Sequence, residues 1–182
     1  MIGCFSLARE TFDIDFAKKK LLKTKKSLTK LNKKIIFFDD LVTNDKIGEN
    51  AIKYFKNIKC TKFIVIQSTF TDAKFISLFV KKFKKPILFI SFKEKRSGGR
   101  LRLNSLCGVN LGLHALIKSK FYSNFTIYTN DEQSFSKEIL KFIKTKNSFT
   151  KKNYLKKINL KVVNKKIIEF KKPKLGLIGE RP

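Results

Sequence analysis

The stretch KFIVIQSTFTDAKFISLFVKKFKKPILFIS, residues 62–91, contains the pattern that decides the fold. It begins with a short apolar run at 62–67 and ends with a second one at 86–91, which Pro86 opens. The segment between them, 72–83, repeats apolar residues at helical spacing: Phe75, Leu78, Phe79 and Phe83. A short run that is apolar throughout is typical of a strand buried on both faces of a sheet. The stretch therefore predicts a strand, a helix and a second strand.

The same alternation continues in both directions. Further strands are predicted at 2–8, 35–39, 125–129 and 174–180. Further helices are predicted at 15–34, 43–58 and 133–144, together with a helix capped by Asn104 or Ser105. Strands that alternate with helices predict a parallel sheet in a doubly wound, Rossmann-like α/β domain with helices on both faces. Because no Pro/Gly-rich linker divides the chain, residues 1–182 are predicted to form a single domain.

The last predicted strand leads directly into the final residues, GLIGERP at 176–182. In an open α/β sheet the loops after the carboxyl ends of strands carry the functional groups. The sequence ends where such a loop should begin. We therefore expect the chain to be the N-terminal fragment of a longer protein.

Charge is the strongest feature of the composition. The chain has 42 basic and 14 acidic side chains, a formal net charge of +28. This balance favours nucleic-acid binding in principle, because phosphates are neutralised by Lys and Arg. Only five of the basic residues are Arg, however, and the lysines are spread along the chain, whereas phosphates and base edges are read mainly by Arg. A genome that has drifted toward AT-rich codons, with lysine filling solvated positions, explains this bias better. We therefore expect no specific nucleic-acid binding.

The cysteine and histidine content limits the chemistry of the chain. Cys4, Cys60 and Cys107 are far apart and odd in number, which is typical of a reducing compartment. With His114 as the single histidine, no conventional metal site is predicted, and we expect this chain to bind no metal or cofactor. No apolar run approaches the ~20 residues that span a bilayer, and the N-terminus lacks the features of a signal peptide. The expected location is the cytoplasm, without a membrane partner.

One segment departs from the Lys-rich composition. SGGRLRLNSLCGVNLGLHAL, residues 97–116, holds four of the eight glycines, two of the five arginines and the single histidine. Gly98 and Gly99 permit backbone angles that other residues avoid, and the N–H groups of the following helix favour an anionic or hydroxyl-rich ligand. Five apolar residues predict the buried stripe of that helix: Leu106, Val109, Leu113, Leu116 and Ile117. Cys107, Asn110 and His114 are predicted on a neighbouring face.

Polar and aromatic residues follow the predicted strands at several points, including Arg9, Gln67, Thr69, Phe70 and Arg100. Because the carboxyl ends of parallel strands meet at one edge, these side chains are expected on one rim of the sheet. The rim is either a ligand site or an interface. The alternatives are a plain turn at 98–99 and surface salt bridges at the arginines. A Cys107–His114 catalytic pair is excluded, because the two lie about 10 Å apart along a helix.

Four motifs together resemble a known family. They are SLARETFDIDFA at 6–17, QSTFTDA at 67–73, GGRLRLNSLCGVNLGLHAL at 98–116 and GLIGERP at 176–182. In this order they resemble the N-terminal region of L-fucose isomerase-like proteins, relatives of the L-fucose and L-arabinose ketol isomerases. The resemblance extends over residues 6–182, essentially the whole chain, and GGRLRLNSLCG is its most specific part.

The resemblance implies an aldose–ketose isomerase of carbohydrate metabolism, an intramolecular oxidoreductase that takes a sugar substrate. The family's Mn²⁺ ligands, two acids and a histidine, are expected in later domains, so no catalytic or metal-binding residue is expected here and the chain alone is expected to be inactive. The N-terminal domain is expected to shape the substrate pocket, often that of a neighbouring subunit in a homo-oligomer. Eight residues are implied as pocket or interface candidates: Arg9, Gln67, Thr69, Phe70, Arg100, Asn104, Ser105 and Cys107.

Two other functions stay open at this point. The first is a free-standing Rossmann-like module that binds a small polar or phosphorylated ligand. The second is a basic protein associated with nucleic acid, which would show binding that falls steeply with salt.

Overall fold

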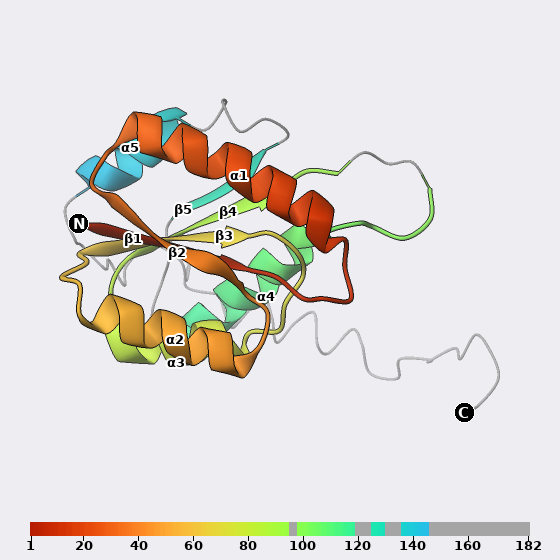
Figure 1. Ribbon diagram of the computed structural model, residues 1–182, viewed down its shortest axis with the longest axis horizontal. Helices are drawn as coiled ribbons and strands as arrows, with labels where there is room; N and C mark the ends of the chain where they lie inside the picture. Colours follow the sequence, from red (N-terminus) through yellow and green to blue (C-terminus); the bar gives the residue numbers. More distant parts are fainter. Residues whose placement is uncertain (95–97, 119–124, 130–135, 146–182) are drawn as a thin grey trace, which may run out of the picture. The chain divides into compact units, whose positions relative to one another are not determined.

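A five-stranded parallel sheet forms the centre of the molecule. The computed structural model describes residues 1–94, 98–118, 125–129 and 136–145. The strands are β1 (Ile2–Leu7), β2 (Ile35–Val42), β3 (Lys62–Gln67), β4 (Ile87–Phe92) and β5 (Phe125–Thr129). Their order in the sheet is β2-β1-β3-β4-β5, and every neighbouring pair is parallel (Figure 1). From β1 the chain adds β2 on one side of the sheet, and then adds β3, β4 and β5 on the other side. The boundary between β1 and β3 is therefore the topological switch point of a doubly wound fold.

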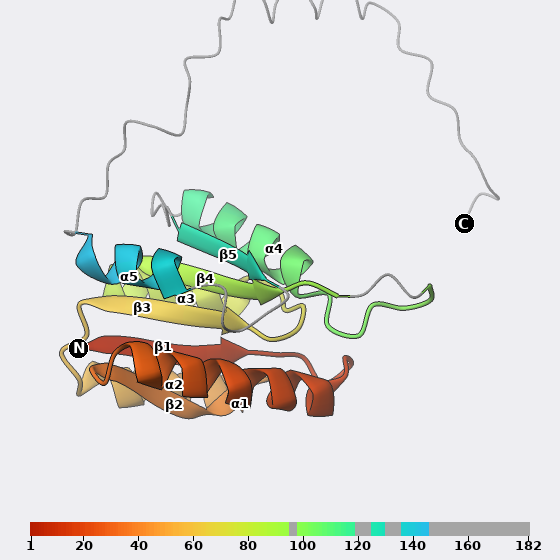
Figure 2. The same ribbon diagram turned by 90° about the horizontal axis from the view of Figure 1, so that it is seen from above.

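Helices cover both faces of this sheet, as predicted. The helices are α1 (Ile14–Leu31), α2 (Asp45–Lys56), α3 (Lys74–Phe83), α4 (Ser105–Lys118) and α5 (Ser136–Lys144). Helices α1 and α5 lie on one face, and α2, α3 and α4 lie on the other (Figures 1 and 2). The Rossmann-like α/β architecture is therefore confirmed. The strand expected at 174–180 lies outside the described residues.

Strand β2 is three residues longer than predicted, because it continues through Asp39 and Asp40 to Val42. It is an edge strand of the sheet, and both aspartates are exposed to solvent, so neither interrupts the core. Charged side chains on an edge strand also discourage pairing with another chain.

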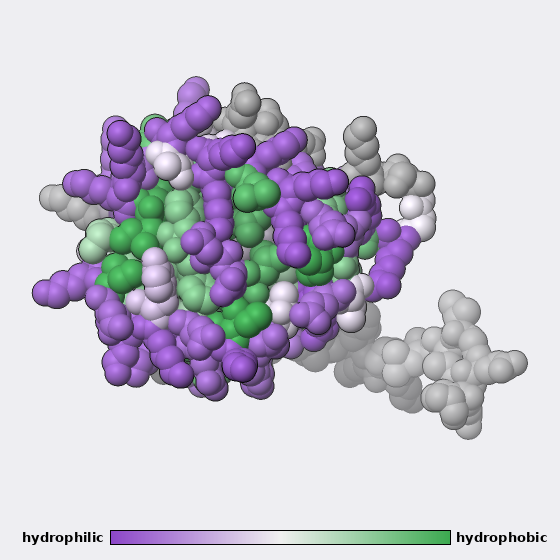
Figure 3. Space-filling model, in the orientation of Figure 1, coloured by the Kyte–Doolittle hydropathy of each residue, from purple (hydrophilic) through white to green (hydrophobic). Residues whose placement is uncertain are grey.

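On the side that Figure 3 shows, hydrophilic side chains cover the helices and leave a hydrophobic band between the two helix layers.

The core beneath α2 and α3 is built from phenylalanine. Phe79 on α3 is fully buried and its ring contacts five others, those of Phe5, Phe55, Phe63, Phe75 and Phe83. The pairs with Phe55 and Phe63 are edge-to-face, a geometry that aromatic rings prefer. This cluster joins β1 and β3 to both helices. Leu78, predicted in the same stripe, is instead 52% exposed.

Helix α4 contacts the core through part of the predicted apolar stripe and through small residues that the stripe did not include. Val109 and Leu116 are buried as predicted, but Leu106 is 39% and Ile117 51% exposed. The buried side is completed by Gly108, Gly112 and Ala115. A Cβ on Gly108 would lie 2.7 Å from Gln67 Nε2, and one on Gly112 would lie 3.1 Å from the Phe89 ring. The stripe prediction was therefore wrong at Leu106 and Ile117, because close approach to β3 and β4 places glycines on the buried side, and glycine gives no hydrophobic signal.

Lys62, at the amino end of β3, is 6% exposed and holds the end of α5. Its ammonium donates to the carbonyl oxygens of Phe142 (2.6 Å), Ile143 (2.8 Å) and Thr145. The three N–H groups thus meet three carbonyls at the C-terminal end of α5, where lysine side chains commonly bind the last carbonyl groups of a helix. Burial lowers the pKa of Lys62 below its usual value, because the charged form loses hydration.

Replacing Lys62 should detach this helix end. We expect Lys62→Met to lower the free energy of unfolding by about 2 kcal/mol, because the charged hydrogen bonds from Lys62 to the end of α5 are lost. Urea denaturation measures the change. Lys137→Met is the matched control on the exposed side of α5, and it should stay within about 0.5 kcal/mol of the parent. Equal effects of the two substitutions would contradict this role of Lys62.

None of the helices in the described part of the chain has the length and apolarity required to cross a membrane.

Candidate functional site

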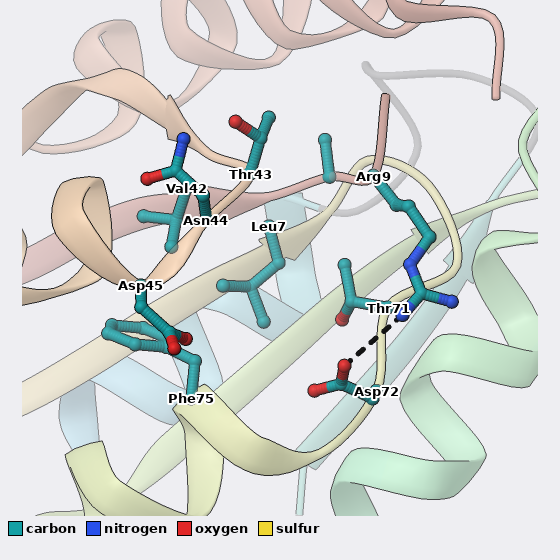
Figure 4. A pocket seen from close by; sticks show the side chains of 10 residues that line it. Leu7, Arg9, Val42, Thr43, Asn44, Asp45, Thr71, Asp72 and Phe75 are labelled. Carbon is teal, nitrogen blue, oxygen red and sulfur yellow. Dashed lines mark hydrogen bonds and ion pairs between the residues drawn. The ribbon is translucent and has the colours of Figure 1, made fainter. Parts of the chain in front are cut away.

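An open pocket lies at the carboxyl ends of β1, β2 and β3, beside the switch point (Figure 4). Its apolar part is formed by Leu7, Ala8, Val42 and Phe75. Its polar part is formed by six residues: Arg9, Thr43, Asn44, Asp45, Thr71 and Asp72. Hydroxyl, amide, carboxylate and guanidinium groups can together donate to and accept from a polyhydroxylated ligand. This is the place where ligands bind in open α/β sheets.

Arg9 stands at the edge of this pocket with its side chain half exposed. Its guanidinium lies 3.2 Å from Asp72 Oδ2, and the two side chains are 44% and 58% exposed. A salt bridge of this exposure contributes about 0–1 kcal/mol. The guanidinium can therefore exchange this partner for a ligand at small energetic cost. Its backbone is fixed, because the Arg9 N–H donates to Thr69 Oγ1 at 2.7 Å.

Gln67 and Thr69 are buried beneath the rim and serve its geometry. The amide of Gln67 donates to the Thr69 carbonyl (2.7 Å) and to Thr71 Oγ1 (2.9 Å). Thr69 is fully buried, and its hydroxyl donates to the Phe70 carbonyl at 3.2 Å. These bonds hold the turn after β3 and orient Thr71 in the pocket. Both residues thus act on the pocket through their neighbours.

Aromatic rings and guanidinium groups alternate along the next part of the rim. Phe70 and Phe12 have ring centroids 6.1 Å apart. The guanidinium of Arg9 lies 5.7 Å from the Phe70 centroid, and that of Arg100 lies 5.3 Å from the Phe12 centroid. Arg100 also donates to the Thr11 carbonyl at 2.9 Å. Cation–π contacts of this kind order exposed arginines without neutralising their charge.

The loop that carries Arg100 is closed by Glu94. The two oxygens of its carboxylate accept from the N–H groups of Leu103 and Asn104, each at 2.7 Å. Ser105 is buried, and its hydroxyl accepts from the Phe92 N–H at 2.9 Å. A carboxylate of the chain thus lies just before α4, where the sequence predicted an anionic ligand. Glu94 was not among the predicted site residues.

The same loop contains three residues with a positive φ angle. Gly98 and Gly99 have φ angles of +77° and +71°, in the region that favours glycine. A Cβ at either position would meet nothing within 4 Å, so the backbone angle rather than close packing requires glycine. Asn104 adopts a φ of +51°, which Asn tolerates better than most residues. Sequence reasoning correctly expected that these glycines adopt backbone angles that other residues avoid.

Arg102 is a second residue that sequence reasoning missed. Its guanidinium pairs with Asp13 at 2.6 Å and lies 4.0 Å from the Phe16 centroid. Asp13 caps α1 by accepting from the Phe16 N–H, and this bond, followed by the bond from Arg102, lowers the pKa of Asp13. Asp13 stands at the capping position before an amphipathic helix, and this pattern was the sequence signal that could have indicated its structural role. The pair links the loop after β4 to the start of α1.

Cys107 and His114 lie on the exposed side of α4. By contrast, Cys4 and Cys60 are buried, and burial raises the pKa of both thiols. Of the eight predicted residues, the structure therefore brings Arg9, Phe70 and Arg100 together on the rim. It places Gln67, Thr69 and Ser105 beneath it, Asn104 in the loop and Cys107 on the helix beyond.

The described residues offer no group of three His, Cys, Asp or Glu side chains that could hold a metal ion. The acids of the pocket already have basic partners, since Asp72 pairs with Arg9 and Asp45 with Lys74. The hydrogen bond from Lys74 to Asp45 is the main cause that raises the pKa of Lys74. The donor set of this pocket does not fit a divalent metal, and no metal is assigned to it.

Residues 3–176 match the family described as the fucose/sulfoquinovose isomerase N-terminal domain, so the chain belongs to that family. Sulfoquinovose isomerases of Priestia megaterium (strain ATCC 12872 / QMB1551) and Priestia aryabhattai are each 28% identical over 137 residues, which is 75% of this chain and 31% of theirs. A sulfoquinovose isomerase of Alkalicoccus urumqiensis is 28% identical over 120 residues, 65% of this chain and 23% of that protein. The matches cover less than a third of the length of these relatives.

Proposed function

We propose that this chain is the substrate-contacting N-terminal domain of an aldose–ketose isomerase, and that the pocket beside Arg9 forms one wall of its sugar site. The observation that carries the proposal is the position of this polar pocket at the switch point of a domain from the isomerase family. The domain holds and orients the sugar. Proton transfer between its carbons belongs to the rest of the enzyme.

The chemistry of the pocket suits a sugar. A sugar hydroxyl both donates and accepts, and the pocket pairs the guanidinium donors of Arg9 with the carboxylate acceptor of Asp72. The apolar side formed by Leu7, Val42 and Phe75 can contact the C–H face of the ring. The weak Arg9–Asp72 pair is already oriented toward the opening, so little is lost when a ligand engages it.

The exposed guanidiniums of Arg9 and Arg100 further favour a sugar that carries an anionic group. Both lie on the same rim, and each is ordered by a phenylalanine ring rather than by full neutralisation. Planar guanidinium groups bind oxyanions through two parallel hydrogen bonds. The names of the relatives make sulfoquinovose the first substrate to test.

The proposed enzyme requires a divalent metal, as the resemblance to ketol isomerases implies, and Mn²⁺ is the ion expected. Because the pocket described here does not fit a metal, its ligands are proposed to lie in the domains that follow this one in the full enzyme. Oligomers of the full enzyme are proposed to bring this rim to a catalytic centre.

The test joins residues 1–182 to the catalytic remainder of the Priestia megaterium relative and measures isomerisation of sulfoquinovose with added Mn²⁺. Loss of one charged hydrogen bond is worth about 1.5–3 kcal/mol. Arg9→Ala should therefore lower kcat/KM roughly tenfold to a hundredfold. The melting temperature should not change, because the Arg9 side chain is exposed.

Arg102→Ala is the matched control, since Arg102 is an exposed arginine of the same rim that faces Asp13 rather than the pocket. It should leave kcat/KM within about twofold. If both variants lose activity equally, or if Arg9→Ala keeps full activity in a folded enzyme, the assignment of Arg9 to the sugar site is wrong.

A further inference from the structure

Gln67, the last residue of β3, is a buried polar side chain with a fixed orientation. It is 1% exposed. Its amide nitrogen donates to the Thr69 carbonyl at 2.7 Å and to Thr71 Oγ1 at 2.9 Å. A backbone carbonyl can only accept, so the end of the amide that faces Thr69 must be the NH₂ group. Both N–H bonds of this group are therefore directed by the turn that follows the strand.

The Gln67 amide also determines what the Thr71 hydroxyl can do. A hydroxyl has one proton to donate, and here its oxygen accepts from Gln67 Nε2. Among the described residues, none accepts a hydrogen bond from Thr71. Thr43, the other threonine that lines the pocket, already donates to Glu10 Oε1 at 3.1 Å. The proton of Thr71 is thus left for a ligand in the pocket that Figure 4 shows.

Helix α4 holds the Gln67 amide from the opposite side. A Cβ at Gly108 would lie 2.7 Å from Gln67 Nε2 and 2.9 Å from its Cδ. Contacts this short require one of the two groups to move. The amide is the end of a flexible side chain, so it would move rather than the helix backbone. Glycine at position 108 therefore leaves the amide in the place from which it donates to Thr71.

We infer that Gln67 is a positioning residue of the sugar site, which fixes Thr71 as a hydrogen-bond donor toward an accepting oxygen of the sugar. The inference rests on the proposed function, because it assigns a polarity to one contact within the same pocket. Arg9, which lines this pocket too, is also a donor. A group that can only donate, such as the ammonium of an amino sugar, would meet donors here and be rejected.

The test uses the protein that joins residues 1–182 to the catalytic remainder, with sulfoquinovose as the probe. Thr71→Val keeps the shape of the side chain but removes its proton. It should raise KM about three- to tenfold and change kcat little, as expected when one neutral hydrogen bond to the bound sugar is lost. Thr71→Ser keeps the hydroxyl, so its KM should stay within about twofold of the parent.

Substrate analogues separate a contact with the sugar from a structural effect. One monodeoxy analogue of sulfoquinovose should be converted equally well by the parent and by Thr71→Val, because it lacks the oxygen that Thr71 contacts. A purely structural loss would instead reduce the conversion of every analogue.

Two further variants test the positioning role. Gln67→Met removes the donor to Thr71 and should raise KM as Thr71→Val does, while Q67M/T71V should raise it no further. Gly108→Ala should displace the amide and raise KM at least about threefold. Gly112→Ala is the matched control on the buried side of the same helix, because its Cβ would lie 3.1 Å from the Phe89 ring and away from the amide. It should leave KM within about twofold, and circular dichroism verifies that all variants fold.

The variants distinguish failure of this inference from failure of the proposed function. An enzyme that Arg9→Ala impairs but Thr71→Val leaves unchanged would overturn the inference and leave the sugar site standing. Equal increases of KM in Gly108→Ala and Gly112→Ala would also overturn it, since general packing would then be the cause. If Arg9→Ala and Thr71→Val both keep full activity, the pocket does not bind the sugar, and both proposals are wrong.

Discussion

Phe79→Ala should lower the free energy of unfolding by about 3–5 kcal/mol, the range for truncating a fully buried phenylalanine. Phe79 is 0% exposed and its ring contacts five other phenylalanine rings. These belong to β1, β3, α2 and α3, so the resulting cavity would separate strands from helices at the middle of the fold. A domain stable by about 5–15 kcal/mol would lose a large part of its stability.

Urea denaturation followed by circular dichroism measures this change. Phe79→Leu keeps most of the volume and should cost less than about 1.5 kcal/mol. Leu78→Ala is the neighbouring control, because Leu78 is 52% exposed, and it should stay within about 0.5 kcal/mol. A loss below 1 kcal/mol for Phe79→Ala would show that the phenylalanine cluster does not support the core as described.

Glu94→Ala should have the second largest effect, a loss of about 2–3 kcal/mol. Its carboxylate accepts from the N–H groups of Leu103 and Asn104, each at 2.7 Å, and both bonds are partly buried. Hydrogen bonds to a charged group are worth about 1.5–3 kcal/mol, and the two donors would be left without this acceptor. Loss of the bonds should also free the loop that presents Arg100 to the rim.

The isosteric variant Glu94→Gln separates charge from shape. It keeps one acceptor oxygen but turns an amide donor toward the second N–H, so roughly half of the loss should remain. Amide hydrogen exchange should accelerate at Leu103 and Asn104 in both variants. Glu49→Ala, at an exposed position of α2, is the control. Unchanged exchange at Leu103 and Asn104 in Glu94→Ala would contradict this role of Glu94.

The sequence predicted the strands more accurately than the way the helices pack on them. Strands β3 and β5 begin and end where predicted, because their apolar runs stand between clear turn and charge signals. Strand β2 runs longer than predicted, since an edge strand tolerates Asp40, which follows Asp39 directly and indicated the end of the strand. The burial of Leu106 and Ile117 on α4 was predicted wrongly, because Gly108 and Gly112, which face the sheet, carry no hydrophobic signal.

The candidate site was predictable as a place but not residue by residue. Strand ends located the rim, and the resemblance to the isomerase family is confirmed by the match over residues 3–176. Burial separates the half-exposed Arg9 from the buried Gln67 and Thr69, and no sequence pattern shows that difference. Glu94 binds backbone groups that lie 9 and 10 positions further along the chain, and Arg102 binds a side chain 89 positions away. Only the folded structure shows these two contacts. The sugar-contacting role of the rim stays a prediction.

The most direct test of that role compares the catalytic remainder of the Priestia megaterium relative with and without residues 1–182 joined to it. The initial rate of aldose–ketose conversion with Mn²⁺ is measured in both proteins after circular dichroism has verified that they fold. The proposal predicts no measurable turnover by the remainder alone and metal-dependent turnover by the joined protein, reduced by Arg9→Ala. Full activity of the remainder alone, or a folded joined protein without activity, would contradict it.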